Sequence, residues 1–432
     1  MLHTARATHK LNSKFRGKSR KRVAKMSNPE TMAVLKRFET TDQVVLRRDA
    51  CLLPKVITDV WRECFTHLDL YEFQQQLPGD SLLSFLRKMR RHFVSVEFRS
   101  ELLQEQLNLL DRSGIAELPL VRDCVIRCDS NGIENATQWP LHTLPKFFKY
   151  LTQLQVEMPV HVGFIEHFKL LKSLTLHNVV SKEALSAIWT GCKALKRLQL
   201  LGPGHPNTIG ISKCLELREL TLNVASFNAS SAFELLQMPQ LQFIELQQHS
   251  ESVETVSEAI CLVLRQRALD VHGIQLHGYR PEQVDWLVKM QLNRCSHLKS
   301  LVISDSLFHG LDMQSLGTLP VLRHVTFWQC FDLRDSQVLH FAKACPHLRQ
   351  LRLLDCRHLT SKMLNEFCEW RCSIKRTSQP LELDLGNCQQ LREEFEKHFL
   401  LQSSLVLVQS KQKHPPPKPH VQFHFLRPVT KQ

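Results

Sequence analysis

A short apolar motif recurs ten times in register along the chain. Each copy reads apolar-x-x-apolar-x-apolar, and the copies begin at residues 151, 171, 195, 217, 241, 271, 298, 322, 348 and 380. Successive copies start 20 to 32 residues apart. One unit of this size cannot bury its own apolar face, so stability has to come from stacking on neighbours. The repeat therefore predicts a solenoid rather than a domain with one central core.

The motif has the two-residue alternation of a strand with one buried face. We call the second apolar residue of each copy position p. Positions p and p+2 are apolar in all ten copies, whereas p+1 is polar in nine of them. Side chains at p and p+2 then point inward, and those at p−1, p+1 and p+3 point to the exposed face of the sheet.

Helical stretches separate the strands. The segment 181–192 begins on Ser181, a good N-cap, and places Ala184, Leu185, Ile188 and Trp189 on one face at helical spacing. Segments 282–295, 334–345 and 361–372 repeat this arrangement. The predicted fold is α/β: a curved horseshoe with parallel strands inside and helices outside.

Cysteines occupy fixed places in this frame. They stand three residues before the first apolar residue, or five after p, at Cys192, Cys214, Cys295, Cys330, Cys345, Cys356 and Cys388. This frame resembles the cysteine-containing leucine-rich repeat of F-box proteins, over about residues 150–390. The units at 151, 171 and 195 depart from it because they lack the second cysteine. The resemblance implies a substrate-recognition subunit of an SCF-type ubiquitin ligase, which is not itself an enzyme.

The family carries a three-helix F-box before its repeats, and residues 52–77 resemble a degenerate one. The adaptor-contacting residues implied by this resemblance are Val56, Val60, Phe65, Leu68, Leu70 and Phe73. Leu53-Pro54 resembles the family's opening Leu-Pro but lies three residues early, and the Val-Cys-x-x-Trp ending is missing. The alternative is an all-α cap that covers the first core face of the solenoid.

The positive charge is concentrated in the ends of the chain. The formal net charge is +14, of which residues 1–30 carry +8 and residues 409–432 carry +5, leaving 14 − 8 − 5 = +1 for the middle. A nearly neutral body argues against a nucleic-acid-reading domain, so nucleic-acid contact is expected only nonspecifically through the tails.

A dense basic block near the N-terminus resembles a nuclear-localisation signal, with Lys18, Arg20, Lys21 and Arg22 at its centre. A plain solvated tail and a transit peptide are the alternatives. We expect the protein in the nucleus, the cytoplasm or both.

Four regions are predicted from these patterns. They are a basic disordered tail (1–45), an F-box-like helical region (46–110), the leucine-rich repeat domain (111–400) and a basic proline-containing C-terminal tail (401–432). Within the last, VQFHFL (421–426) alternates like a strand and is expected to dock on the last repeat.

The sequence offers no catalytic, cofactor or metal motif. Phosphate-binding loops, Gly-x-Ser-x-Gly and His-Glu-x-x-His are absent. Cys345, His347, Cys356 and His358 have zinc-type residues, but the strand between them would have to fold back, and we interpret the thiols as reduced structural cysteines. No cofactor, metal, small-molecule substrate or membrane span is expected.

Function is expected on the exposed strand face. The candidate partner-binding residues there are Phe243, Thr326, Trp328, Gln350, Arg352 and Leu354. The expected partners are the SCF linker subunit with its cullin complex and a protein substrate. The alternative function is a leucine-rich scaffold or binding protein, perhaps nuclear, without a link to ubiquitin.

Overall fold

A computed structural model describes residues 66–77, 79–128, 141–157, 162–177, 181–202, 208–248, 253–278, 289–306, 316, 319–373, 381–388, 391, 393, 405–408 and 420–426. The chain divides into two compact units, residues 1–158 and 159–432, and each is described by itself. Among the described residues, no helix has both the length and the apolar character needed to cross a lipid bilayer.

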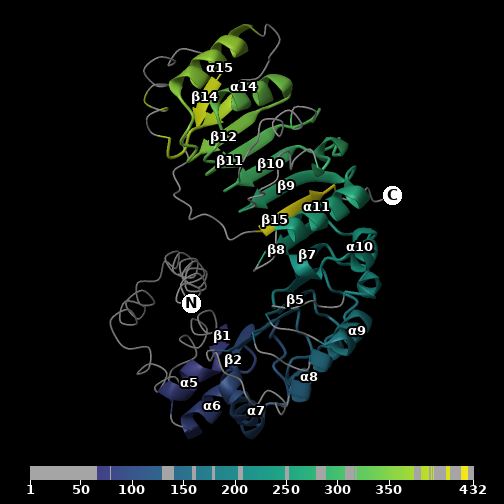
Figure 1. Cartoon of the computed structure of the whole chain (residues 1–432). Coiled ribbons are helices and arrows are strands. Elements are labelled where there is room, and N and C mark those ends of the chain that lie inside the picture. The colour runs from purple at the N-terminus through teal and green to yellow at the C-terminus, as the bar shows by residue number, and fades with distance from the viewer. Residues whose placement is uncertain are drawn as a thin grey trace, which may run out of the picture. The chain divides into compact units, whose positions relative to one another are not determined.

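Unit 1 is built on parallel strands with helices between them. The strands, in spatial order, are β1 (His67–Asp69), β2 (Ser95–Arg99), β3 (Asp123–Arg127) and β4 (Gln153–Val156). The connecting helices are α5 (Leu70–Gln76), α6 (Gly79–Met89), η1 (Ser100–Leu102), α7 (Leu103–Arg112), η3 (Leu141–Thr143) and α8 (Leu144–Phe147). Figure 1 shows α5, α6 and α7 beside these strands.

The repeat begins well before residue 111, which corrects the expected all-α region over 46–110. β1 and β2 both lie in that range and pair in parallel. The motif continues upstream with other apolar residues in place of leucine, as Phe93, Val96 and Phe98 around β2, all fully buried. Because Phe and Val fill the inward positions as well as Leu does, the strand pattern survives although the leucines are lost.

Unit 2 contains the longer sheet. Its strands, in spatial order, are β5 (Ser173–Leu176), β6 (Arg197–Leu200), β7 (Glu219–Asn223), β8 (Phe243–Gln247), β15 (His420–Phe425), β9 (Val271–His277), β10 (Ser300–Ser304), β11 (His324–Trp328), β12 (Gln350–Leu354), β13 (Leu381–Asp384) and β14 (Leu405–Val408). All neighbouring pairs except those of β15 are parallel.

Short helices connect these strands. They are η4 (Val162–His167), α9 (Lys182–Gly191), η5 (Ile211–Lys213), η6 (Val224–Ser226), α10 (Ala229–Leu236), α11 (Val253–Arg267), η7 (Leu292–Arg294), α14 (Asp335–Ala344) and α15 (Ser361–Ser373). Ser181 caps α9 as predicted, because its hydroxyl accepts a hydrogen bond from the Ala184 amide at 3.3 Å.

The repeat frame sets the register of the sheet. Position-p residues of adjacent strands lie opposite one another, as Leu301, Val325, Leu351 and Leu383 do, and all four are buried. The predicted parallel, repeat-type sheet with one apolar face is therefore confirmed in this part of the chain. Its interior is a ladder of leucine-like side chains between the strands and the helices.

The chain turns away from several strands on a residue with positive φ. Asp305, Gln329, Asp355 and Asn387 all stand at p+4, with φ between 53 and 60°. The amide of Gln329 donates to the Leu354 carbonyl of the next repeat at 2.8 Å, so the turn also joins adjacent units. A recurring left-handed residue at one position is what a stacked repeat requires if every strand is to end in the same way.

The conserved places of the cysteines in the frame are explained by hydrogen bonds between repeats. The thiols of Cys330, Cys356 and Cys388 donate to carbonyl oxygens at position p+2 of the preceding repeat, at 3.5 to 3.6 Å. Burial raises the pKa of the Cys356 thiol to about 12. These protonated thiols fill the corner between strand and turn.

The C-terminal strand lies in the middle of unit 2, which corrects the expectation that it docks on the last repeat. β15 pairs antiparallel with both β8 and β9 and so separates two consecutive repeats, as Figure 1 shows. Residues 401–432 are therefore not simply a tail. The inward residues Val421, Phe423 and Phe425 are buried, and this apolar row is what a solenoid interior accepts.

Candidate functional site

The exposed face of β11, β12 and β13 brings together five of the six predicted partner-binding residues. Trp328 and Leu354 are register partners on adjacent strands, so their half-buried side chains stand side by side. Thr326, Arg352 and Asp384 form the next row, one residue pair closer to the strand starts. An apolar pair beside a charged row is the composition of a protein-binding surface.

Ion pairing fixes the charged row. Arg352 Nε lies 3.0 Å from Asp384 Oδ2, and the Asp384 side chain is only 4% exposed while that of Arg352 is 35% exposed. The carboxylate is thus covered by the guanidinium, which offers its remaining N–H groups to solvent. Gln350 repeats the arrangement in the next row, where its amide donates to Glu382 at 2.9 Å. Thr326 itself is buried and contributes little surface.

Phe243, the sixth candidate, is not free on the strand face. Its ring lies 4.9 Å from the ring of His424 on β15. The C-terminal strand therefore takes up the surface that was predicted to bind a partner there. A hollow of about 600 Å³ lies beside it, lined by Phe243, His424, Glu219, His272 and Lys299 among others.

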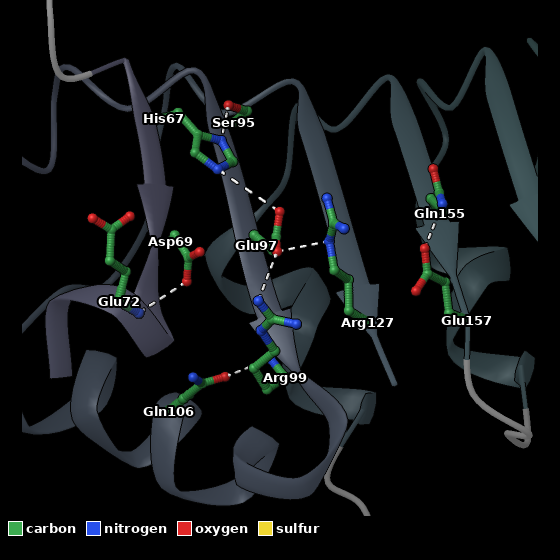
Figure 2. A network of polar contacts seen from close by, with 10 residues as sticks. All are labelled: His67, Asp69, Glu72, Ser95, Glu97, Arg99, Gln106, Arg127, Gln155 and Glu157. Carbon is green, nitrogen blue, oxygen red and sulfur yellow. Dashed lines mark hydrogen bonds and ion pairs between the residues drawn. The ribbon is translucent and has the colours of Figure 1, made fainter. Parts of the chain in front are cut away.

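A second polar cluster, which the sequence patterns did not indicate, lies on the strand face of unit 1. Figure 2 shows Glu97 of β2 at its centre, between strands β1 and β3. Glu97 Oε1 lies 2.7 Å from Arg127 Nε and 3.6 Å from an Arg99 guanidinium nitrogen, and Oε2 lies 3.8 Å from His67 Nε2. The carboxylate is 7% exposed and both arginines are partly covered. We call these four residues the Glu97 cluster.

Opposing effects act on the charge of Glu97. Burial raises the pKa of the Glu97 carboxyl above its ordinary value, and the positive charge of Arg127 is the largest effect that lowers it. Nearby Asp69 raises the pKa further. A buried carboxylate in this position needs its guanidinium partners, because an unpaired buried charge is costly.

A hydrogen-bonded chain of amides supports the Glu97 cluster from the helix side. The Arg99 backbone amide donates to Gln106 Oε1 at 3.0 Å, and the Gln106 amide nitrogen donates to Gln74 Oε1 at 3.0 Å. Gln106 is fully buried. His67 Nδ1 lies 2.7 Å from Ser95 Oγ, so the imidazole at the edge of the cluster is also held. The cluster is a fixed mixed-charge surface rather than a set of mobile side chains.

Sequence reasoning missed this cluster because residues 46–110 were read as helical. The signal that identifies it is the continued motif at Phe93, Val96 and Phe98, which places Ser95, Glu97 and Arg99 on the exposed face.

The candidate adaptor-binding residues fall into two groups. Leu68, Leu70 and Phe73 are buried, with 0 to 2% of each residue exposed, and they belong to β1 and α5. This corrects the expectation that they form a contact surface, because the repeat interior accounts for their apolar character. Val56, Val60 and Phe65 lie outside the described residues, as do Lys18, Arg20, Lys21 and Arg22.

The zinc-type residues of 345–358 are separated in the structure. Cys345 is buried and its thiol donates to the Leu316 carbonyl at 3.8 Å, whereas His347 and His358 are exposed. Within the described residues, no three His, Cys, Asp or Glu side chains gather closely enough to hold a metal ion.

Comparisons with known proteins add one similarity in structure. The chain matches no known protein-family model, and no curated protein matches it in sequence. A solved leucine-rich repeat protein of Leptospira interrogans is similar with a TM-score of 0.36 and 14% identity, over 77% of this chain and 92% of that one. The assignment of a leucine-rich repeat-type sheet rests on the repeat spacing and strand register described above.

Proposed function

We propose that the chain is a non-catalytic scaffold that binds a protein partner on the exposed strand face of β11–β13. The observation that supports this most directly is the adjacent pair Trp328 and Leu354, which the register places beside the Arg352–Asp384 ion pair. Partly exposed aromatic and apolar groups next to an arginine are typical of residues that dominate binding energy at protein interfaces. The partner is expected to bring an apolar side chain to this pair and an acidic group to Arg352.

Site-specific photo-crosslinking in cells tests this proposal. A photoreactive amino acid at position 350, on the strand face, is compared with one at exposed Lys343 on the outer helix α14. We expect a defined protein to be captured from position 350 and not from 343. Its capture should fall at least tenfold in Trp328→Ala but not in Phe233→Ala, which truncates an exposed aromatic residue on α10. Equal capture from both positions, or insensitivity to Trp328→Ala, would contradict the proposal.

A narrower form of the proposal makes the bound protein the substrate of an SCF-type ubiquitin ligase. Its support is the resemblance of residues 52–77 to a degenerate F-box and of the repeats to those of F-box proteins. Because Leu68, Leu70 and Phe73 are buried in the repeat interior, adaptor binding would have to use Val56, Val60 and neighbouring residues N-terminal to β1.

Co-purification with the SCF linker subunit tests the narrower form. Deleting residues 51–93 would remove β1, α5 and α6 and unfold unit 1, so the informative variant is the double substitution Val56→Asp/Val60→Asp. We expect the intact chain to capture the linker and the double variant to lose it while the partner of the strand face is retained. If the intact chain captures no linker, the protein is a scaffold without a link to ubiquitin.

A further inference from the structure

The slot between β8 and β9 is a strand-binding site within unit 2. These two strands belong to consecutive repeats, yet β15 lies between them and pairs antiparallel with each. Gln422, for example, is the register partner of Glu245 on one side and of Gln275 on the other. The slot thus has two hydrogen-bonding edges, where a sheet that takes up an added strand usually offers one.

Backbone hydrogen bonds continue to the end of the strand. The Phe425 amide donates to the Gln242 carbonyl at 2.8 Å, and the Leu426 amide donates to the Asp270 carbonyl at 2.7 Å. These bonds reach the loops that precede β8 and β9, so the occupant is held along its full length.

Side chains of the slot select an alternating sequence. Val421, Phe423 and Phe425 are at most 2% exposed, whereas His420, Gln422 and His424 face outward. Arg267 closes the inner end, with its guanidinium 4.4 Å from the centre of the Phe425 ring. That guanidinium is oriented by Asp270 at 2.8 Å and by the Leu236 carbonyl at 3.1 Å.

One glycine makes room for the occupant on the exposed face. Gly273 stands opposite His424, and a Cβ at position 273 would lie 3.2 Å from the His424 Cβ. The equivalent p−1 position of neighbouring strands carries Phe243, Ser300 and His324. The one strand that needs space for β15 at this position therefore has no side chain there.

An empty slot would be costly. It would leave the backbone groups of two strand edges unpaired and open holes where three apolar side chains are buried. Any occupant must therefore be a strand with an apolar-polar-apolar-polar-apolar pattern. The sequence whose fit the structure demonstrates is 420–426, and every copy of the chain carries it.

The connection to β15 bears on which copy supplies the strand. β14 and β15 are six strand positions apart, about 29 Å at the usual spacing of about 4.8 Å. Eleven residues, 409–419, join them, and four of these are proline. Proline-rich segments favour an extended, stiff conformation of about 3.1 Å per residue, or about 37 Å over these twelve steps. A stiff segment longer than its gap has to bend to deliver the strand to its own chain, whereas delivery to a second chain removes that constraint.

We propose that the slot is an interface for a second copy of this chain, in which each β15 fills the slot of the other molecule. Exchange of identical strands produces a closed, two-fold symmetric dimer and leaves no slot empty. The inference is independent of the partner proposed for β11–β13.

Shortening the connection tests the proposal in the full-length chain. Deleting residues 411–416 leaves six steps between Val408 and His420, which span at most about 21 Å and cannot reach the slot of the same molecule. We expect this variant to have twice the monomer mass by light scattering, with amides of 420–426 as protected from hydrogen exchange as in the intact chain. A monomer, whether those amides are protected or not, would overturn the proposal.

Substitutions in the shortened chain identify the interface. Phe423→Asp places a charge in the buried row and should return the variant to a monomer, whereas Gln422→Ser, on the outward side of the same strand, should remain dimeric. A dimer that persists with Phe423→Asp would show that association does not use the slot, and would also overturn the proposal.

A cleaved form of the chain gives a second readout if the shortened chain does not fold. A protease site placed between residues 411 and 414 is cut after folding, and a labelled peptide of residues 419–427 is added in excess. We expect the labelled peptide to replace the resident strand, and the Phe423→Asp peptide to do so at least tenfold less. Absence of uptake after days of incubation would mean that the slot accepts no strand in trans.

Discussion

Gly273 of β9 lies directly opposite His424 of β15, at a separation that leaves no room for a larger residue. We expect Gly273→Val to weaken the docking of β15, because its methyl groups would press on the His424 side chain. The free energy of unfolding should fall by about 1–3 kcal/mol, as for overpacking elsewhere. Hydrogen exchange should rise at residues 420–426 first. Ser300→Val, the same position on the adjacent strand β10, is the control and should leave that exchange unchanged.

Gly191, the last residue of α9, is packed against the backbone of η4. A Cβ there would lie 2.4 Å from the Glu166 carbonyl oxygen and 2.6 Å from its Cα, so the backbone itself would have to move. We expect Gly191→Ala to reduce the free energy of unfolding by about 2 kcal/mol or more, measured by urea denaturation. Gly163→Ala in η4 meets no atom within 4 Å and should be close to neutral. Equal stability of the two variants would contradict this account of the packing.

The Glu97 cluster predicts a linked change in ionisation. Removing Arg127 by Arg127→Gln removes the largest effect that lowers the pKa of Glu97, so that pKa should rise further above its ordinary value. Carbon-13 chemical shifts of glutamate carboxyls, assigned with Glu97→Gln, would measure it. A pKa that stays the same or falls would show that Arg127 does not stabilise the carboxylate.

The same substitution should destabilise the protein most at neutral pH. There Glu97 is ionised and buried, and we expect a loss of about 2 kcal/mol. The loss should shrink as the pH falls through the folded-state pKa of Glu97, because the protonated acid no longer needs the guanidinium. Lys146→Gln, which breaks an exposed pair with Asp111, is the control and should cost less than about 0.5 kcal/mol.

His277 makes the slot sensitive to acid. Burial lowers the pKa of the His277 imidazole to about 4, and the neighbouring His420 ring at 4.4 Å lowers it as well. The folded protein therefore favours the neutral ring, whereas the unfolded chain protonates it near its ordinary pKa of 6.5. Its effect on stability is absent above about pH 7, grows as the pH falls from 6.5 to about 4, and is then constant, reaching roughly 3 kcal/mol.

Unfolding curves of the intact chain and of His277→Gln, measured from pH 7 to pH 4, would isolate this contribution from that of the carboxylates. The difference between the two free energies should change by one to three kcal/mol over this range, with the intact chain losing more. The other polar groups that contact the ring, Ser304 Oγ at 2.6 Å and Gln275 Oε1 at 3.4 Å, carry no charge. A constant difference would mean that the imidazole is not held neutral.

The sequence predicted the parts of the fold that depend on neighbours in the repeat. The strands from β5 to β13, the cap at Ser181 and the partners of Trp328 follow from period and register alone. The strands β1 to β3 were missed because Phe, Val and Cys replace leucine, as at Cys124 of β3. Their alternation was still readable once the frame was extended upstream.

The position of β15 could not be predicted in the same way. Its alternation indicates a strand, but the strand's neighbours are about 150 residues away in the chain, and nothing local to 420–425 specifies them. Two features at the receiving side were readable in hindsight: the spacing of 30 residues between the motifs at 241 and 271, and the glycine at p−1 in the second. The Glu97 cluster was missed for a related reason, since its residues become neighbours only when three strands are stacked.

The late position of β15 in the chain also governs biosynthesis. A ribosome makes β8 and β9 more than 140 residues before it makes the strand that joins them, so the repeats on either side cannot close on each other while translation proceeds. During that interval the two open edges are available to chaperones and to other nascent chains. A premature stop codon anywhere before residue 420 would leave every earlier repeat intact in sequence and yet yield a protein divided at its centre.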